Sequence, residues 1–417
     1  MEENFHDPYE YIRGVLQILI SDKKRIGFLF GAGTSLAIKN DKSLSVPCIN
    51  DLTNDVLKCL TDENKTYGNV FNEIKKELGS DNFDIESLLT NLEQKYEIIG
   101  GSTLNSMNKD GFSKLIGKIK LSIKEKMSVH SSASIENIEA LVQTDFADWI
   151  KQANRKHPIE IFTLNYDYLF ELGLEHKNVP YYDGFTGSYQ PFFHSESIED
   201  MAYLPKQTKL WKIHGSLGWS YDKSLNKILR KDSNENDLVI YPSMLKYQDS
   251  KKLPYISYMD RLSNFIKQDD SVLITCGYSY RDEHINERLT SALNSDTNSH
   301  VIALCFSDIV DCPELKTIAE GNNKLSAYGF KDAIIGCKYG KWKLRAEPDK
   351  DETPNINLYY DEDAPLNPDD EIGKEKKGEE KWTGLGKFIL CDYAKLTSFL
   401  NSLIVFNEVR EMGKNGK

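Results

Sequence analysis

Apolar residues near the start of the chain recur at helical spacing and then give way to a short continuous apolar run. The spacing predicts a helix over Tyr9–Leu19 whose apolar side consists of Ile12, Val15, Leu16 and Leu19. The run over Ile26–Phe30 is typical of a buried strand and leads directly into a glycine-rich segment. The chain therefore opens with a helix and a strand that ends at Gly31.

The stretch from residue 50 to residue 152 has helical spacing throughout. One apolar stripe follows Asp84, a candidate N-cap, and consists of Ile85, Leu88, Leu89 and Leu92. A second stripe consists of Ile138, Leu141 and Val142. No convincing strand pattern interrupts this stretch, so we expect residues 50–152 to form a large all-helical insertion.

From residue 159 the pattern changes to short apolar runs that end in polar residues. The predicted strands are Ile159–Leu164, Lys209–Ile213, Leu238–Tyr241, Val272–Cys276 and Val301–Phe306. Helical patterns over Asp167–Leu174 and Asp282–Leu293 follow two of them. This alternation favours a parallel α/β sheet, in which ligands bind at the carboxyl ends of the strands.

These patterns divide the chain into three parts. We expect an α/β core from residues 1–49 and 153–310, the helical insertion 50–152, and a C-terminal region 311–417. Residues 347–381 hold 13 acidic residues, five basic residues and four prolines, which predicts a solvated, mobile loop. The apolar run Phe388–Phe406 predicts a terminal amphipathic helix that docks on the core or on another chain.

Composition excludes several classes of protein. Lys and Arg number 52 against 64 Asp and Glu, a net charge of −12 that disfavours direct binding to nucleic acid. With 40% hydrophobic and 28% charged residues, the chain is typical of a soluble globular protein. It shows neither a signal peptide nor an apolar run of the ~18–20 residues that span a membrane, so we expect a cytoplasmic protein without membrane association.

The seven cysteines form no C-x-x-C pair, and several lie inside apolar runs. An odd number of cysteines in such surroundings predicts buried free thiols rather than disulfides or a zinc site.

Four segments with chemically useful residues each follow a predicted strand. The first is Gly31-Ala32-Gly33-Thr34-Ser35, where glycines let backbone N–H groups approach a pyrophosphate and a hydroxyl adds a donor. A tight structural turn accounts for the same glycines equally well.

The second segment is Thr163-Leu164-Asn165-Tyr166-Asp167. The Asn165 side chain carries both a donor and an acceptor, so it suits a ribose hydroxyl or a bound water, and Asp167 suits a carboxamide. The simpler role for both residues is to cap the helix that follows.

The third segment, Lys212-Ile213-His214-Gly215-Ser216, brings a histidine to a strand end. A histidine is the natural general base at neutral pH, and the adjacent glycine leaves room for a ligand. Of the eight histidines, only His214 is both at a strand end and followed by glycine.

The fourth segment follows the strand Val272–Cys276 and contains Gly277 and Ser279, with Asp282 as a candidate cap of the next helix. Gly277 and Ser279 suit a second phosphate or an adenosine ribose. An ordinary strand-to-helix turn is the alternative.

In this order, the four segments resemble the sirtuin family of NAD-dependent enzymes, whose NAD pocket is built from a GAG-x-S loop, a T-x-N-x-D motif, a His-Gly pair and a G-x-S turn. The resemblance covers residues 27–306 apart from the helical insertion, and it implies a Rossmann-like, sirtuin-type core. It also implies the site residues, of which the pyrophosphate would lie on Gly31, Ala32, Gly33, Thr34 and Ser35. The nicotinamide half would lie on Asn165 and Asp167, and the adenosine half on Gly277 and Ser279. His214 would be the catalytic base.

The chain departs from protein-deacylating sirtuins at two places. It lacks their four-cysteine zinc module, and their P-D-F-R segment is replaced by Val46-Pro47-Cys48-Ile49-Asn50-Asp51-Leu52. With the helical insertion, these departures resemble the sirtuin-like domains of bacterial anti-phage defence proteins, which hydrolyse NAD. The chain length resembles the stand-alone subunit that pairs with a HerA-type hexameric ATPase.

The resemblance thus implies an NAD glycohydrolase that releases nicotinamide and ADP-ribose in abortive infection, as a homo-oligomer with a HerA-type ATPase and without zinc or another metal. Asn165 would orient the attacking water and the ribose, and His214 would accept a proton. Two alternatives use the same pocket: an NAD-dependent protein deacylase or ADP-ribosyl transferase, and a non-catalytic sensor of NAD or ADP-ribose.

Overall fold

The computed structural model of the chain describes residues 4–80, 83–153, 155–222, 224–231, 238–240, 253–348, 354–362 and 383–415. Its central feature is a ten-stranded sheet that carries the site, with strand order β1-β15-β14-β13-β12-β11-β2-β3-β7-β4. In that order the strands are Phe5–His6, Lys338–Trp342, Asp332–Ile335, Leu325–Tyr328, His300–Leu304, Ser271–Cys276, Arg25–Phe30, Glu160–Thr163, Thr208–Lys212 and Tyr181–Tyr182.

The strands from β13 to β4 pair in parallel, which confirms the predicted parallel α/β core. The edge formed by the C-terminal strands is mixed, because β14 runs antiparallel to both of its neighbours, β13 and β15. The C-terminal region therefore contributes strands to the same sheet rather than folding apart from it.

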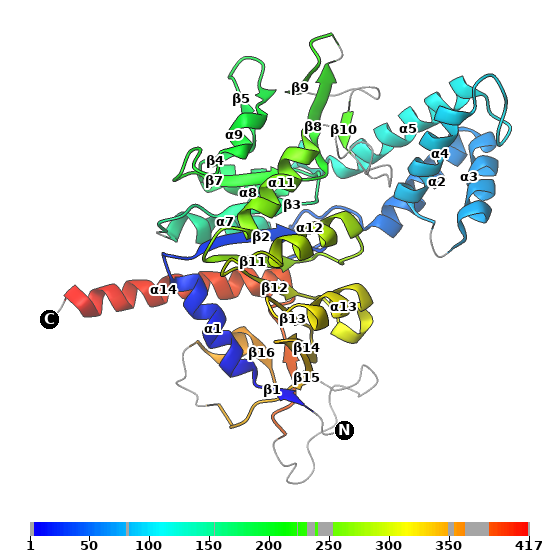
Figure 1. The fold of residues 1–417 in the computed structure, drawn as a ribbon. Helices are drawn as coiled ribbons and strands as arrows, with labels where there is room; N and C mark the ends of the chain where they lie inside the picture. The colour runs from blue at the N-terminus through cyan, green and yellow to red at the C-terminus, as the bar shows by residue number, and fades with distance from the viewer. Residues whose placement is uncertain are drawn as a thin grey trace.

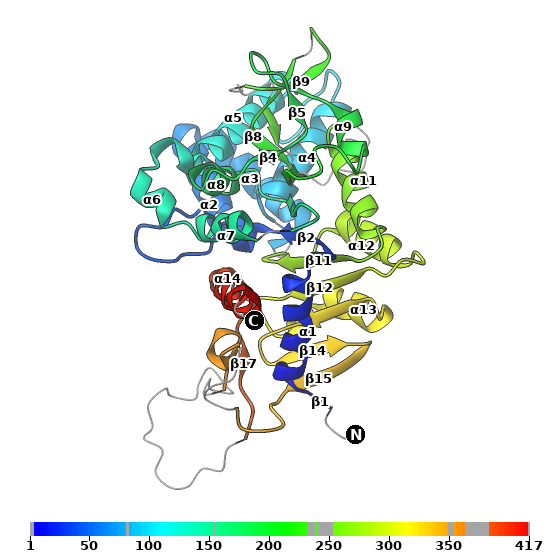
Figure 2. The same ribbon diagram turned by 90° about the vertical axis from the view of Figure 1, so that its left-hand side faces the viewer.

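Helices cover both faces of this sheet because its strands are apolar on both sides. Along β2, the Phe28 and Phe30 side chains lie in the core on one face, and that of Leu29 lies in the core on the other. The first face packs against α1 (Pro8–Ile20), α7 (Val142–Gln152), α8 (Leu169–His176) and α14 (Tyr393–Asn415). The second packs against α11 (Tyr255–Ile266), α12 (Glu283–Leu293) and α13 (Pro313–Gly321), and Figure 2 shows α14 and these three helices on opposite sides of the sheet.

Four helices form a separate cluster with its own apolar core, and Figure 1 shows them projecting away from the sheet. They are α2 (Ile49–Glu63), α3 (Lys65–Leu78), α4 (Ile85–Ile98) and α5 (Lys109–Met127). The expected cap of α4 is confirmed, because the Asp84 carboxylate accepts a hydrogen bond from the Ser87 N–H and the Ser87 hydroxyl accepts one from the Asp84 N–H.

The helical stretch does not all belong to this cluster. After η3 (Val129–Ser132) and α6 (Ile135–Glu139), α7 packs in the core of the main sheet through Phe146 and Trp149. The last part of the expected insertion thus lies with the sheet.

A second, five-stranded sheet lies beyond the β7 end of the first and has the order β10-β8-β9-β6-β5. Its strands are Leu238–Ile240, Gly215–Asp222, Lys227–Arg230, Phe192–Phe193 and Phe185–Thr186. We expected the 238–241 run in the parallel sheet, and that prediction is wrong, because β10 pairs antiparallel with β8. The physical reason lies at Gly215, whose φ of +92° turns the chain out of the main sheet after β7.

The terminal helix α14 docks on the core of its own chain, since the apolar side chains Leu396, Phe399, Leu400 and Leu403 are all buried there. Part of the expected acidic loop is also packed: Tyr359 and Tyr360 are buried, and β16 (Tyr360–Asp361) pairs with β17 (Lys387–Phe388). The prediction of a solvated loop is wrong for this part, while residues 349–353 and 363–381 lie outside the described residues.

The cysteines are free, and Cys276, Cys305 and Cys391 are buried as expected. The expectation is wrong for Cys59, which lies on an exposed position of α2. Across the described ranges, no helix is both long and apolar enough to cross a membrane.

Candidate active site

Four neighbouring strands end at the same level of the main sheet. Phe30 of β2 pairs with Cys276 of β11 and with Thr163 of β3, and Thr163 pairs in turn with Lys212 of β7. Two of the four segments singled out in the sequence begin at the next residue, Gly31 and Gly277, and the other two begin at the last strand residue itself, Thr163 and Lys212. The sheet register therefore gathers all four at one edge, where ligands of parallel sheets bind.

The glycine loop packs directly on the turn after β11. A Cβ on Gly33 would lie 2.8 Å from the Cα of Gly277, and one on Gly277, where φ is +65°, would lie 2.7 Å from the Thr34 nitrogen. Two loop N–H groups donate across this contact, from Gly31 to the Cys276 carbonyl (3.2 Å) and from Gly33 to the Gly277 carbonyl (3.0 Å). These glycines are thus required by the close approach of two backbones.

The loop then forms a short 3₁₀ turn, η1 (Ala32–Thr34). The Thr34 and Ser35 N–H groups donate within the loop, to the carbonyls of Gly31 and Ala32. In the described part of the chain, the Ala32 N–H has no acceptor, and Ala32 is exposed. Of the five residues expected to hold a pyrophosphate, Ala32 is the one that offers an open backbone donor.

Asn165 is tied to the glycine loop rather than to the start of α8. Its side-chain nitrogen donates to the Gly31 carbonyl (3.0 Å), the Thr34 hydroxyl (3.1 Å) and the Ser35 hydroxyl (2.7 Å). The side-chain oxygen of Asn165 has no hydrogen-bond partner among the described residues. The amide therefore fixes the loop through its nitrogen and leaves its oxygen as an acceptor.

Asp167 contacts both the start of α8 and the glycine loop. One carboxylate oxygen accepts from the Leu169 N–H (3.0 Å) and so caps the start of α8, and the other accepts from the Ser35 hydroxyl (2.7 Å). We call Thr34, Ser35, Asn165 and Asp167 the motif network. All four are buried, so the side chains of Thr34 and Ser35 face Asn165 and Asp167 inside the protein.

His214 meets a partner that sequence analysis did not assign to it. Its Nε2 lies 3.2 Å from a carboxylate oxygen of Asp282, with 15% and 13% of the two side chains exposed. The other Asp282 oxygen accepts from the His284 and Ile285 N–H groups and caps α12, as expected. No sequence signal marks this pair, because 67 residues separate its members and only the common level of the strand ends brings them together.

The expected site residues thus form two groups. Asn165 and Asp167 join the glycine loop, and His214 joins Asp282 at the start of α12. Ser279 lies exposed on the turn between β11 and α12, and Gly277 supports the glycine loop. No hydrogen bond links Asn165 to His214 within the described ranges. A histidine oriented by a carboxylate is the arrangement of a general base.

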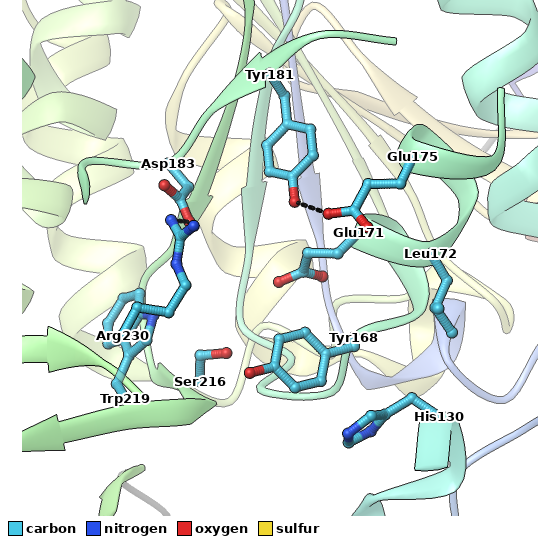
Figure 3. Close-up of a pocket in the computed structure, with 10 residues that line it drawn as sticks. All are labelled: His130, Tyr168, Glu171, Leu172, Glu175, Tyr181, Asp183, Ser216, Trp219 and Arg230. Atoms are coloured by element: carbon cyan, nitrogen blue, oxygen red, sulfur yellow. Dashed lines mark hydrogen bonds and ion pairs between the residues drawn. The ribbon is translucent and has the colours of Figure 1, made fainter. Parts of the chain in front are cut away.

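Sequence analysis missed a cavity of about 260 Å³ that lies beside α8. Figure 3 shows its lining, formed by His130, Tyr168, Glu171, Leu172, Glu175, Tyr181, Asp183, Ser216, Trp219 and Arg230. Below it, the Lys212 ammonium donates to Glu171 (2.8 Å) and to the Asp167 carbonyl. Lys212 therefore connects this acidic cavity to the backbone of the motif network.

In the ranges that the structure describes, no three His, Cys, Asp or Glu side chains gather in a way that could hold a metal ion.

Comparison with known proteins bears on the same edge of the sheet. No curated protein matches the chain in sequence. Residues 159–328, less than half of the chain, match the family model of the SIR2-like domain. The matched segment includes Asn165, Asp167, His214, Gly277 and Ser279, and it begins after the glycine loop. The match supports a sirtuin-like family for this segment and fits an NAD-dependent enzyme.

Proposed function

We propose that the chain is an NAD glycohydrolase, which converts NAD and water to nicotinamide and ADP-ribose. The observation that carries the proposal is the convergence of the glycine loop, Asn165 and the His214–Asp282 pair at one edge of the sheet. The match of residues 159–328 to the SIR2-like domain agrees with NAD as the substrate.

NAD fits this edge through specific groups. The exposed N–H of Ala32, at the start of η1, is a donor for a pyrophosphate oxygen. The Asn165 side-chain oxygen is an acceptor for a ribose hydroxyl or for the attacking water, because its nitrogen is held by the loop. The site thus combines an anion donor with a fixed polar acceptor, as binding of a dinucleotide requires.

The reaction breaks the bond between the nicotinamide nitrogen and C1′ of the ribose. Nicotinamide takes both electrons of that bond and leaves as a neutral molecule, while positive charge develops on the ribose. Water then bonds to C1′ and loses a proton. We assign Asn165 to hold the water and the ribose, and His214, oriented by Asp282, to accept a proton from the water or a ribose hydroxyl.

We further propose that this activity serves anti-phage defence by depleting NAD, in a homo-oligomer controlled by a HerA-type hexameric ATPase. The support is the resemblance of the whole motif set, together with the large helical cluster α2–α5 and a sequence without any C-x-x-C pair. An enzyme that removes an essential cofactor has to be restrained until infection, and a partner subunit can supply that restraint.

Nicotinamide release from NAD by the purified chain tests the proposal. The assay is run with the chain alone and with the ATPase partner, each with and without an acylated peptide. Release that does not depend on the peptide is the expected result.

The other outcomes identify the alternatives. Release that requires the peptide establishes a deacylase or ADP-ribosyl transferase. Binding of NAD without release under any of these conditions establishes a sensor. Either result overturns the proposed hydrolase.

A further inference from the structure

The acidic cavity contains a carboxylate that the protein satisfies only in part. Glu171 is nine-tenths buried, and one of its oxygens receives the Lys212 ammonium at 2.8 Å. The other oxygen is buried and has no hydrogen-bond partner in the described structure. A buried carboxylate oxygen without a donor is costly, so this atom marks a position where a ligand donor would be stabilising.

The charges around the cavity are unequal. Three carboxylates line it, those of Glu171, Glu175 and Asp183, whereas Arg230 is the one Arg or Lys side chain among the lining residues. Arg230 is already paired with Asp183, and Lys212, below the cavity, with Glu171. The Glu175 carboxylate accepts only the neutral Tyr181 hydroxyl among the described contacts (2.8 Å). The cavity therefore retains an excess of negative charge.

The pKa shifts of the groups around the cavity have two main causes, burial and the neighbouring carboxylates. Burial is the main cause of the raised pKa values of Glu171 and Asp183. Burial also raises the pKa of Tyr181, and the neighbouring carboxylates of Glu171, Glu175 and Asp183 raise it further. The carboxylates around Tyr181 thus oppose added negative charge, whereas burial disfavours charge of either sign and lowers the pKa of His130 in the same lining.

The walls are aromatic as well as acidic. Figure 3 shows the Glu171 carboxylate between the rings of Tyr181 and Tyr168, with Asp183 on one side. Aromatic rings next to carboxylates favour organic cations, which combine a charge with an apolar or planar surface. Small-molecule sites of this kind have few polar groups, each at a defined position.

We propose that this cavity binds a small organic cation, whose ammonium or guanidinium group donates to the unpartnered oxygen of Glu171. A volume of about 260 Å³ accommodates such a group with a short alkyl chain. Glu175, one helical turn further along α8, provides a second acceptor. The residues that line this cavity include none of those proposed to hold NAD.

Calorimetric titration of the full chain with butylguanidinium tests the proposal, with butylurea as the neutral probe of the same shape. The expected result is binding of butylguanidinium and no binding of butylurea. Glu171→Gln should weaken binding by about tenfold or more, because a charge-assisted hydrogen bond is lost. The readout is binding alone, so failure here is distinguishable from failure of the proposed NAD hydrolysis.

A second variant covers the case that Glu171→Gln fails to fold, since that change leaves Lys212 without its carboxylate. Glu175→Gln changes an exposed side chain of α8 that contacts the Tyr181 hydroxyl, and it should also weaken binding. Glu196→Gln is the matched control, because Glu196 is 88% exposed, pairs with His194 and does not line the cavity. The affinity of the Glu196→Gln chain for butylguanidinium should equal that of the unchanged chain.

Three results would overturn the proposal: no binding of butylguanidinium to the unchanged chain, equal binding of butylurea, or equal affinity in all folded variants. A further titration with N-acetylarginine amide distinguishes the source of the cation. Tighter binding than butylguanidinium identifies an arginine side chain as the natural occupant, and weaker binding identifies a free small molecule.

Discussion

The motif network and the acidic cavity carry polar groups of opposite character. In the motif network, Ser35 receives a hydrogen bond from Asn165 and donates one to Asp167, and the Asn165 side-chain oxygen is left as an acceptor. The acidic cavity keeps a buried Glu171 oxygen that has no hydrogen-bond partner in the described structure. Hydrogen-bonded networks hold their side chains in one geometry, whereas a buried polar atom without a partner is stabilised when a ligand supplies one. The motif network is therefore held in place before a ligand binds, whereas the Glu171 oxygen of the acidic cavity gains its partner from a ligand.

The largest expected effect tests how tightly the glycine loop packs on the turn after β11. Gly277→Ala adds a Cβ 2.7 Å from the Thr34 backbone at a φ of +65°, so it should lower the free energy of unfolding by about 2–4 kcal/mol. Gly321→Ala is the control, because its Cβ would meet open space and should change stability by about 0.5 kcal/mol or less. Urea unfolding measures both. Equal stability of the two variants would contradict the backbone packing described for the glycine loop.

Asp282→Asn tests the orientation of His214. Asparagine still caps α12, so the melting temperature should stay close to that of the unchanged chain. Loss of the carboxylate beside His214 should lower kcat for nicotinamide release by about 100-fold with little change in KM. A fall in melting temperature without a fall in kcat would restrict Asp282 to its capping role.

Ser35→Ala opens the motif network at its centre. The change removes one of three acceptors of the Asn165 nitrogen and leaves a buried Asp167 oxygen without the hydroxyl that donates to it, so it should cost about 1–2 kcal/mol of unfolding free energy. Ser398→Ala, at an exposed position of α14, removes a local hydroxyl contact and should cost less than about 0.5 kcal/mol. Comparable losses in the two variants would argue against the motif network.

The smallest expected effect separates the motif network from the acidic cavity. Glu175 lines the cavity and makes no contact with the motif network. Glu175→Gln should therefore change nicotinamide release by about twofold or less, a change typical of a surface substitution away from the chemistry. A loss of tenfold or more in the same assay would show that the motif network and the cavity act as one site.

The hydrophobic pattern predicted the main strands and helices because they depend on local periodicity. Register could not be predicted, since pairing of Phe30 with Thr163 and Cys276 joins segments more than a hundred residues apart. The placement of β10 was wrong because a positive φ at Gly215 redirects the chain, and an apolar run does not report which sheet it joins.

Prediction of the site was similarly divided. The segments were found because each polar residue follows an apolar strand, as Asn165 follows β3 and His214 follows β7. The link between His214 and Asp282 was missed, because it depends on how two loops meet. Glu171 was missed because its sequence neighbours suggest an ordinary amphipathic helix, and only the structure shows its oxygen buried without a donor.

The most direct test of the central claim is nicotinamide release by Asn165→Ala and His214→Ala chains. Each substitution should lower the rate by about 100-fold or more, in the range expected for removal of a positioning amide or a general base. Asn298→Ala, at an exposed position, and His194→Ala, at the end of β6 in the second sheet, should retain the full rate. Full activity in folded Asn165→Ala and His214→Ala chains would contradict the assignment of the active site to this edge of the sheet.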